Sequence, residues 1–141
     1  MDRPGSWCSP QGRRLSQRRF RSRPATVITL DRANLLPAIV FIFSRAGCED
    51  AVSEVLASGV SLTTRSQAER IRNIAQSAVS SIPVEDYAVL GIDPWIRALE
   101  RGVAAHHAGM LPLVKETVEK LFTMGLLRIV YATETLALGI N

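Results

Sequence analysis

The 141 residues have the composition of a single globular domain, with 47% hydrophobic and 21% charged residues. Their apolar runs are far shorter than the roughly 20 residues that a membrane helix needs. The arginine-rich first residues lack the apolar stretch of a secretory signal. We therefore expect neither a membrane partner nor a signal peptide. The net charge of +4 is uneven, because seven arginines against one aspartate give residues 1–24 a charge of +6 and leave −2 for the rest.

Residues 1–24 predict a disordered basic tail. They are rich in Gly, Pro, Ser, Gln and Arg, a composition that buries too little apolar surface to fold. Such a tail either binds nucleic-acid phosphates or serves as a solvated linker, and the tail's composition leaves both interpretations open. Its arginines are Arg3, Arg13, Arg14, Arg18, Arg19, Arg21 and Arg23.

The next stretch predicts a strand followed by a helix. Residues 25–36 are ambiguous, because Thr, Val and Ile favour a strand whereas their second half suits a short helix or a loop. Residues 38–43, AIVFIF, are apolar without alternation, which predicts a parallel strand buried on both faces. A helix ending near Gly59 follows, with Glu49 and Asp50 in its first turn. Its apolar positions recur at three and four: Cys48, Ala51, Val52, Val55 and Leu56.

The second half of the chain alternates helices and strands. The segment TRSQ at residues 64–67 predicts a capping box, and the apolar stripe after it predicts a helix that ends before Pro83. Asp93 and Pro94 predict the start of another helix, which ends at Gly102. Strands are predicted at residues 103–106 and 127–132, with a helix between them from Pro112 to Gly125. This order predicts an α/β fold with a doubly wound, mostly parallel sheet and flanking helices.

Small and polar residues follow each predicted strand, at residues 44–47, 106–109 and 133–135. The carboxyl ends of parallel strands meet at one edge of a sheet, and ligands bind there. A helix N-terminus, glycines, hydroxyls and Arg45 at that edge would suit phosphates. We therefore expect a ledge that tracks the backbone of a single nucleic-acid strand. Ser44, Thr133 and Thr135 have the simpler interpretation of ordinary caps at element ends.

Other chemistry finds little support in the sequence. His106 and His107 are adjacent and would point to opposite faces of a strand, so no metal site is expected. Cys8 and Cys48 form no disulfide framework and favour a reducing, cytoplasmic compartment. There is no G-x-S-x-G nucleophile elbow and no G-x-x-x-x-G-K-[ST] phosphate loop. We expect no catalytic residues and no ATP hydrolysis from this chain alone.

Three segments carry a resemblance to a known family: FIFSRAGCEDAV, GVAAHHAGMLPLVKETVEKLF and LLRIVYATETLALGIN. They resemble blocks of the second RecA-like domain of Ski-like DExH-box helicases of superfamily 2, and in particular the actinobacterial HelY group. The resemblance covers residues 25–141. It implies a partial RecA-like domain belonging to an ATP-dependent helicase that acts on nucleic acid, RNA more than DNA.

The resemblance also implies roles for individual residues. Contacts with the nucleic-acid strand would come from the blocks after the three strands, through Ser44, Arg45, His107, Gly109, Thr133 and Thr135. Near the ATP cleft, two residues would couple this grip to the nucleotide state, Gly139 and Asn141. Residues 25–36 would form a helix, and residues 1–24 would be a tether.

In the family, a first RecA-like domain carries the phosphate loop and the D-E-x-H motif, and so binds ATP and Mg²⁺. Neither these motifs nor the Q-x-x-G-R-A-G-R block occurs in the 141 residues. The resemblance therefore implies a fragment that needs the first domain as its partner and binds neither ATP nor Mg²⁺ tightly alone. Two alternatives remain: a stand-alone, non-catalytic nucleic-acid-binding module and a fragment without function.

Overall fold

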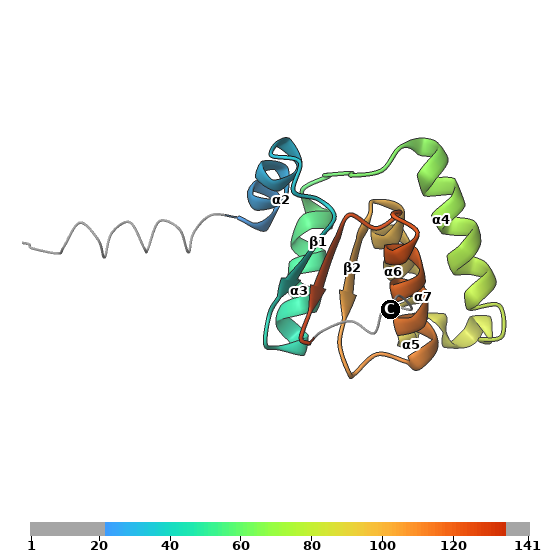
Figure 1. Ribbon diagram of the computed structural model, residues 1–141. Coiled ribbons are helices and arrows are strands. Elements are labelled where there is room, and N and C mark those ends of the chain that lie inside the picture. Colours follow the sequence, from blue (N-terminus) through green and yellow to red (C-terminus); the bar gives the residue numbers. More distant parts are fainter. Residues whose placement is uncertain (1–21, 135–141) are drawn as a thin grey trace, which may run out of the picture.

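The computed structural model describes residues 22–134. It confirms the predicted α/β fold, because a three-stranded, all-parallel sheet lies between layers of helices (Figure 1). In chain order the elements are α2 Arg23–Arg32, β1 Ala38–Phe41, α3 Arg45–Ala57, α4 Arg65–Ala78, the 3₁₀-helix η1 Val84–Asp86, α5 Tyr87–Leu90, α6 Ile92–Glu100, β2 Val103–His106, α7 Pro112–Thr123 and β3 Ile129–Ala132.

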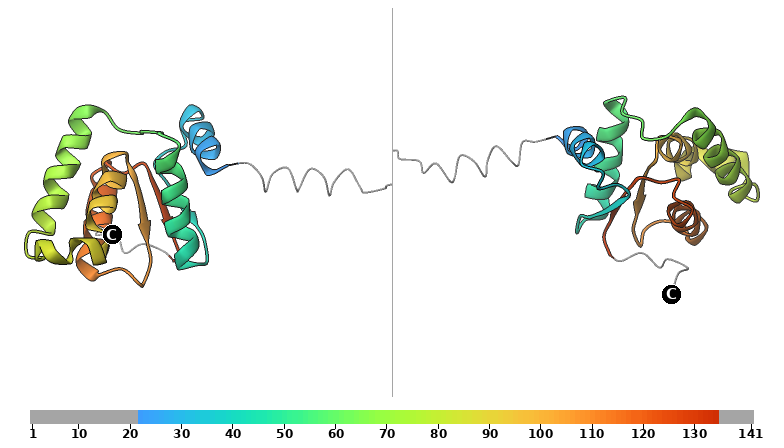
Figure 2. Two further views of the ribbon diagram at one scale, coloured as in Figure 1. Left: turned by 180° about the vertical axis from the view of Figure 1, so that it is seen from behind. Right: turned by 45° about the horizontal axis from the view of Figure 1, so that its top comes forward.

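The strand order is β1-β3-β2, so the chain crosses the sheet in one direction and then returns. Helix α3 belongs to the outward crossing and α7 to the return. Right-handed crossovers in opposite directions place their helices on opposite faces of the sheet. Figure 2 shows this arrangement, with α3 covering the face seen from behind. The sheet is therefore doubly wound, as predicted.

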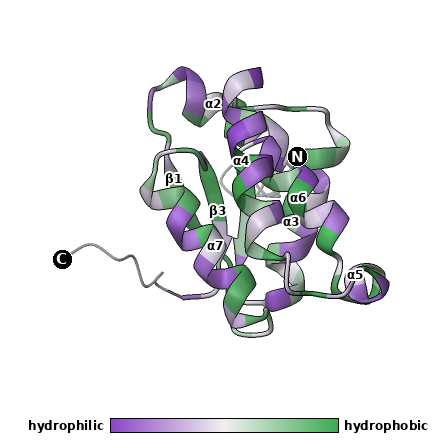
Figure 3. Ribbon diagram, turned by 90° about the vertical axis from the view of Figure 1, so that its right-hand side faces the viewer, coloured by the Kyte–Doolittle hydropathy of each residue, from purple (hydrophilic) through white to green (hydrophobic). Residues whose placement is uncertain are grey.

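Each face of the sheet has its own core. One cluster joins β2 and β3 to α4, α6 and α7, and the other joins them to α2 and α3. All residues of β2 and β3 are buried, and β3 is hydrophobic along its length (Figure 3). Alternate residues of a strand point to opposite faces, so Val130 enters the first cluster and Ile129 and Tyr131 the second.

Strand β1 differs from its prediction. It ends at Phe41, which is 48% exposed, and its other residues are half-buried. Phe43, predicted to belong to the strand, lies beyond its end and is 89% exposed. The prediction that this strand is buried on both faces is therefore wrong, whereas β2 and β3 are fully buried. Among the described residues β1 lies at an edge of the sheet, a position that a run of apolar residues does not reveal.

Two details predicted for the helix starts are wrong. Helix α3 begins at Arg45, because the Ser44 hydroxyl caps it, so Glu49 and Asp50 lie beyond the first turn. Helix α6 begins at Ile92 after Gly91, whose φ of 66° is left-handed and also ends α5. Asp93 is thus a first-turn residue and not an N-cap. Ile92, the first residue of α6, is buried.

Other local predictions are confirmed. Thr64 and Gln67 form both hydrogen bonds of a capping box at the start of α4. The ambiguous stretch 25–36 is mostly helical, as the resemblance implied, in a helix that already starts at Arg23. Arg23 holds that helix against α3 through hydrogen bonds from its backbone N–H and its guanidinium to the carboxylate of Glu54. No helix within residues 22–134 is long and apolar enough to cross a membrane.

Candidate functional site

The three strands end level with one another. In the register of the sheet, Ala132 of β3 lies between Phe41 of β1 and His106 of β2. Hydrogen bonds extend the pairing just beyond the strands, from the N–H of Ile42 to the carbonyl of Ala132 and from the N–H of Thr133 to the carbonyl of His106. Residues 42–47, 107–109 and 133–134 thus leave the sheet side by side. We call these three segments the carboxyl edge.

Ser44 caps α3 at the carboxyl edge. Its hydroxyl oxygen accepts a hydrogen bond of 3.0 Å from the N–H of Gly47, which confirms the simpler interpretation of this serine as a cap. The hydroxyl proton is still available to a ligand, because a serine can donate and accept at once. Packing explains why residue 47 is a glycine, since a Cβ there would lie 2.8 Å from Cγ2 of Ile42. The first turn of α3 therefore sits close against the end of β1.

Arg45, His107 and Gly109 meet at the same edge although they come from two separate segments. A Cβ added at Gly109 would lie 3.2 Å from Nδ1 of His107 and 3.3 Å from both Cδ and Nη1 of Arg45. The arginine side chain therefore lies over the Gly109 turn. Arg45 is exposed, and among residues 22–134 it has no carboxylate partner. A cation of this kind beside a helix N-terminus is suited to bind an anion.

The imidazole of His107 is already occupied within the protein. Its Nε2 lies 2.7 Å from Oε2 of Glu49, and its Nδ1 accepts a hydrogen bond of 3.1 Å from the N–H of Gly109. The residue is also buried. A direct contact from His107 to a phosphate would thus have to come from its backbone. The sequence analysis did not identify Glu49 as a partner, because the two residues are 58 positions apart.

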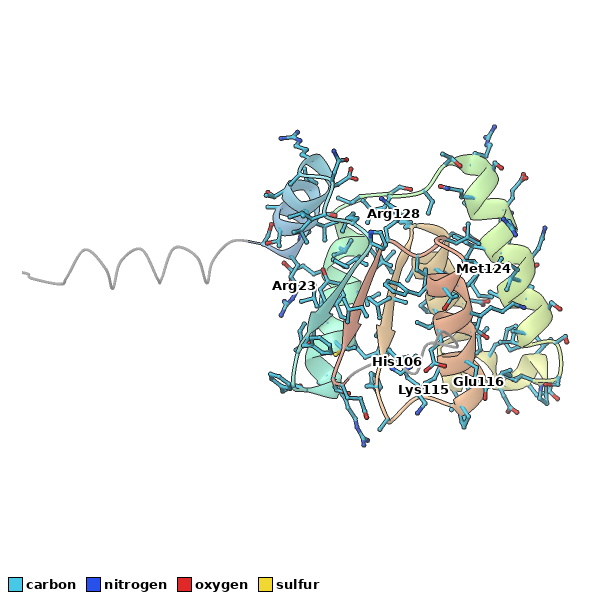
Figure 4. All side chains as sticks on the ribbon, viewed as in Figure 1. Arg23, His106, Lys115, Glu116, Met124 and Arg128 are labelled. Atoms are coloured by element: carbon cyan, nitrogen blue, oxygen red, sulfur yellow. The ribbon has the colours of Figure 1, made fainter. Side chains whose placement is uncertain are left out.

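His106 points to the other side of the sheet, as its position next to His107 predicts. Its Nε2 lies 2.8 Å from Oε2 of Glu119 on α7, and Figure 4 shows it at the end of β2 on that side. The two histidines therefore do not converge. Within residues 22–134 no group of three or more His, Cys, Asp and Glu side chains could hold a metal ion.

Cys48 is the buried residue of the first turn of α3. Burial, with a smaller effect from Glu49, raises the pKa of its thiol, so the thiol stays protonated near neutral pH. Its Sγ donates a weak hydrogen bond to the carbonyl of Ile42. Cys48 is thus a core residue and no nucleophile.

The end of β3 completes the carboxyl edge. Thr133 is half-buried, and its backbone N–H is bound to the carbonyl of His106. Of the predicted site residues, the structure therefore brings Ser44, Arg45, His107, Gly109 and Thr133 to one edge. Three others lie outside the described residues: Thr135, Gly139 and Asn141.

Comparison with known proteins shows the class of protein to which the chain is related. The chain is homologous to a region of the DExH-box helicases of the Ski2-like group. It is 51% identical over 119 residues to the probable helicase HelY of Mycobacterium tuberculosis, an alignment that covers 84% of this chain and 13% of HelY. No protein-family model matches the chain.

More distant relatives come from eukaryotes. Over 118 residues the chain is 35% identical to the antiviral helicase SKI2 of Saccharomyces cerevisiae, covering 84% of this chain and 9% of that protein. Over 112 residues it is 38% identical to the DExH-box ATP-dependent RNA helicase DExH11 of Arabidopsis thaliana, covering 79% and 8%. The chain thus spans only a small part of each of these relatives.

Proposed function

We propose that the carboxyl edge binds the phosphates of a single nucleic-acid strand as part of an ATP-dependent helicase. The observation that carries the proposal is the exposed guanidinium of Arg45, which lies over the Gly109 turn beside the capped start of α3. The names of relatives such as DExH11 favour RNA over DNA. Contacts to phosphates would grip the strand without reading its sequence.

Each donor at the edge has a specific part in this proposal. Arg45 supplies the positive charge and a fork of N–H groups. The first turn of α3 supplies backbone N–H groups and the positive end of the helix dipole. The hydroxyls of Ser44 and Thr133 supply further donors from the ends of β1 and β3. Neighbouring strands are about 4.8 Å apart, so the ends of β1 and β3, from which Ser44 and Thr133 come, lie about 5 Å apart.

ATP hydrolysis belongs, in this proposal, to the complete helicase. A first RecA-like domain would hold ATP and Mg²⁺, and this chain would close the cleft and couple the nucleotide state to the grip on the strand. Gly139 and Asn141 are the residues proposed for that coupling. We expect no ATP turnover by the 141 residues alone. ATP turnover that purifies with this chain would contradict this part of the proposal.

The test compares Arg45→Ala with the substitution of another exposed arginine, both made in the full chain. Binding is measured by the fluorescence anisotropy of a labelled uridine RNA of about 12 nucleotides, a typical length for a single-strand site, and of its DNA counterpart. Arg45→Ala should weaken binding about tenfold and lower the salt slope by about 1. The control is Arg97→Ala, which removes an exposed arginine near the end of α6. Equal losses in both variants would mean nonspecific attraction and would refute the proposal.

A further inference from the structure

Glu49 and the Gly109 turn hold the imidazole of His107 from two sides. The carboxylate of Glu49 lies 2.7 Å from Nε2, and the N–H of Gly109 lies 3.1 Å from Nδ1. The side chain of His107 is 8% exposed and that of Glu49 is 57% exposed. The histidine is thus fixed inside the protein, whereas its carboxylate partner reaches it from the surface of α3.

These two contacts determine which ring nitrogen carries the proton. Because the N–H of Gly109 donates to Nδ1, that nitrogen must be unprotonated. The proton then lies on Nε2, which donates to Glu49. An imidazolium would direct a second N–H at the N–H of Gly109 and lose that hydrogen bond. The geometry thus selects the neutral Nε2–H tautomer.

Helix α3 contacts the loop after β2 at two points, one turn apart. Arg45 and Glu49 are separated by four residues and so lie on the same face of the helix. Glu49 holds His107, and Arg45 lies over Gly109. The carboxylate of Glu49 turns towards His107, and among residues 22–134 it forms no ion pair with Arg45. Within these residues the guanidinium therefore has no direct carboxylate partner that a ligand would have to displace.

We infer that Glu49 is a positioning residue for phosphate binding at the carboxyl edge, an inference that rests on the proposed function. It keeps His107 in the Nε2–H tautomer, which holds the Gly109 turn beneath Arg45. The expected change in binding on removal of Glu49 has an unusual sign. Removing a carboxylate next to an anion site normally strengthens anion binding by reducing repulsion, whereas loss of a positioning residue weakens it.

The experiment uses three variants of the full chain and the labelled RNA described above. Glu49→Ala removes the acceptor and should weaken binding roughly threefold to tenfold. Glu49→Gln removes the charge but keeps an acceptor oxygen, so binding should be retained. The matched control Asp50→Ala removes a charge from the neighbouring exposed position and should leave binding unchanged or tighter. Tighter or unchanged binding by Glu49→Ala would overturn the inference.

Nitrogen-15 NMR of the histidine rings gives a readout that does not depend on RNA. In the unchanged chain and in Glu49→Gln, His107 should show a protonated Nε2 and an unprotonated Nδ1. In Glu49→Ala this single tautomer should be lost while the backbone spectrum stays folded. A mixed or charged His107 in the unchanged chain would overturn the inference.

The two levels of the proposal can fail separately. If Arg45→Ala still weakens binding but Glu49→Ala does not, the positioning role is wrong and phosphate binding stands. If Arg45→Ala has no effect, the proposed function fails and the role of Glu49 in binding fails with it, whatever NMR shows of the tautomer.

Discussion

His106 and His107 are neighbours in the sequence, yet they bind carboxylates on opposite layers of the domain. His106 contacts Glu119 on α7 at 2.8 Å, and His107 contacts Glu49 on α3 at 2.7 Å. Successive strand residues point to opposite faces, so a pair of histidines at the end of β2 is held by both layers. The residues at the end of β2 are thereby fixed before any ligand binds.

The contact between His106 and Glu119 should contribute to stability. The Nδ1 of His106 is buried and has no partner among the described residues, so Nε2 makes the one hydrogen bond of this ring. Glu119→Ala should lower the free energy of unfolding by about 1–3 kcal/mol, the cost of leaving a buried polar group unsatisfied. Urea unfolding measures this loss. The control is Glu116→Ala, an exposed acid on the same helix; equal effects of both changes would contradict the prediction.

Gly47→Ala should destabilise the domain although alanine favours helices. In a helix that is otherwise unconstrained the change would stabilise by about 1 kcal/mol. Here the new Cβ would lie 2.8 Å from Cγ2 of Ile42, and overpacking of this kind costs about 1–3 kcal/mol. Thermal or urea unfolding should therefore show a net loss. A gain in stability would mean that the first turn of α3 does not press against the end of β1.

Gly109→Ala should affect binding more than stability. The added Cβ would lie 3.3 Å from Cδ and Nη1 of Arg45 and 3.2 Å from Nδ1 of His107, so the flexible arginine must move aside. We expect weaker binding to single-stranded RNA with an almost unchanged unfolding curve. In the background of Arg45→Ala the second change should add little further loss. Additive losses would show that Gly109 acts independently of Arg45.

The buried hydroxyl of Tyr131 should make the free energy of unfolding depend on pH in the alkaline range. The residue is 3% exposed, and burial raises the pKa of its hydroxyl to about 12. Because the folded state holds the proton more tightly than the unfolded chain, with its pKa of about 10, stability from this group is complete below pH 10. It should fall by about 1.4 kcal/mol per pH unit as the pH rises from 10 towards 12. The free energy of unfolding of Tyr131→Phe, measured across this pH range, should lack this decline. If its dependence on pH equals that of the unchanged chain, the decline does not come from Tyr131.

Much of the fold could be predicted because its signals are local. Thr64 and Gln67 form their capping box three residues apart, and Gly102 and Gly125 follow the ends of α6 and α7 with positive φ angles. The residues of β2 were predicted without error, from the short run VAAH that follows Gly102. The start of α6 was missed because Gly91 begins the helix earlier than Asp93 and Pro94 suggest.

The candidate site was only partly predictable. That Ser44, Arg45, Gly109 and Thr133 follow strand ends could be read from the order of the elements, and the level register places them at one edge. The partners of His106 and His107 could not be read, because Glu49 and Glu119 lie on helices whose faces the sequence pattern does not orient. Whether these residues contact a nucleic acid stays a prediction.

The sequence by itself determined most of the elements, the capping box of Thr64 and Gln67 and the residues that follow each strand, because these depend on contacts within a few positions. Only the tertiary structure decided that β1 lies at an edge among the described strands and that Arg45 lies over Gly109. It also decided that the imidazole of His107 is occupied by Glu49. Strand order and the packing of helices across a sheet join residues far apart in the chain, and such contacts are chosen by the whole fold, not by local pattern.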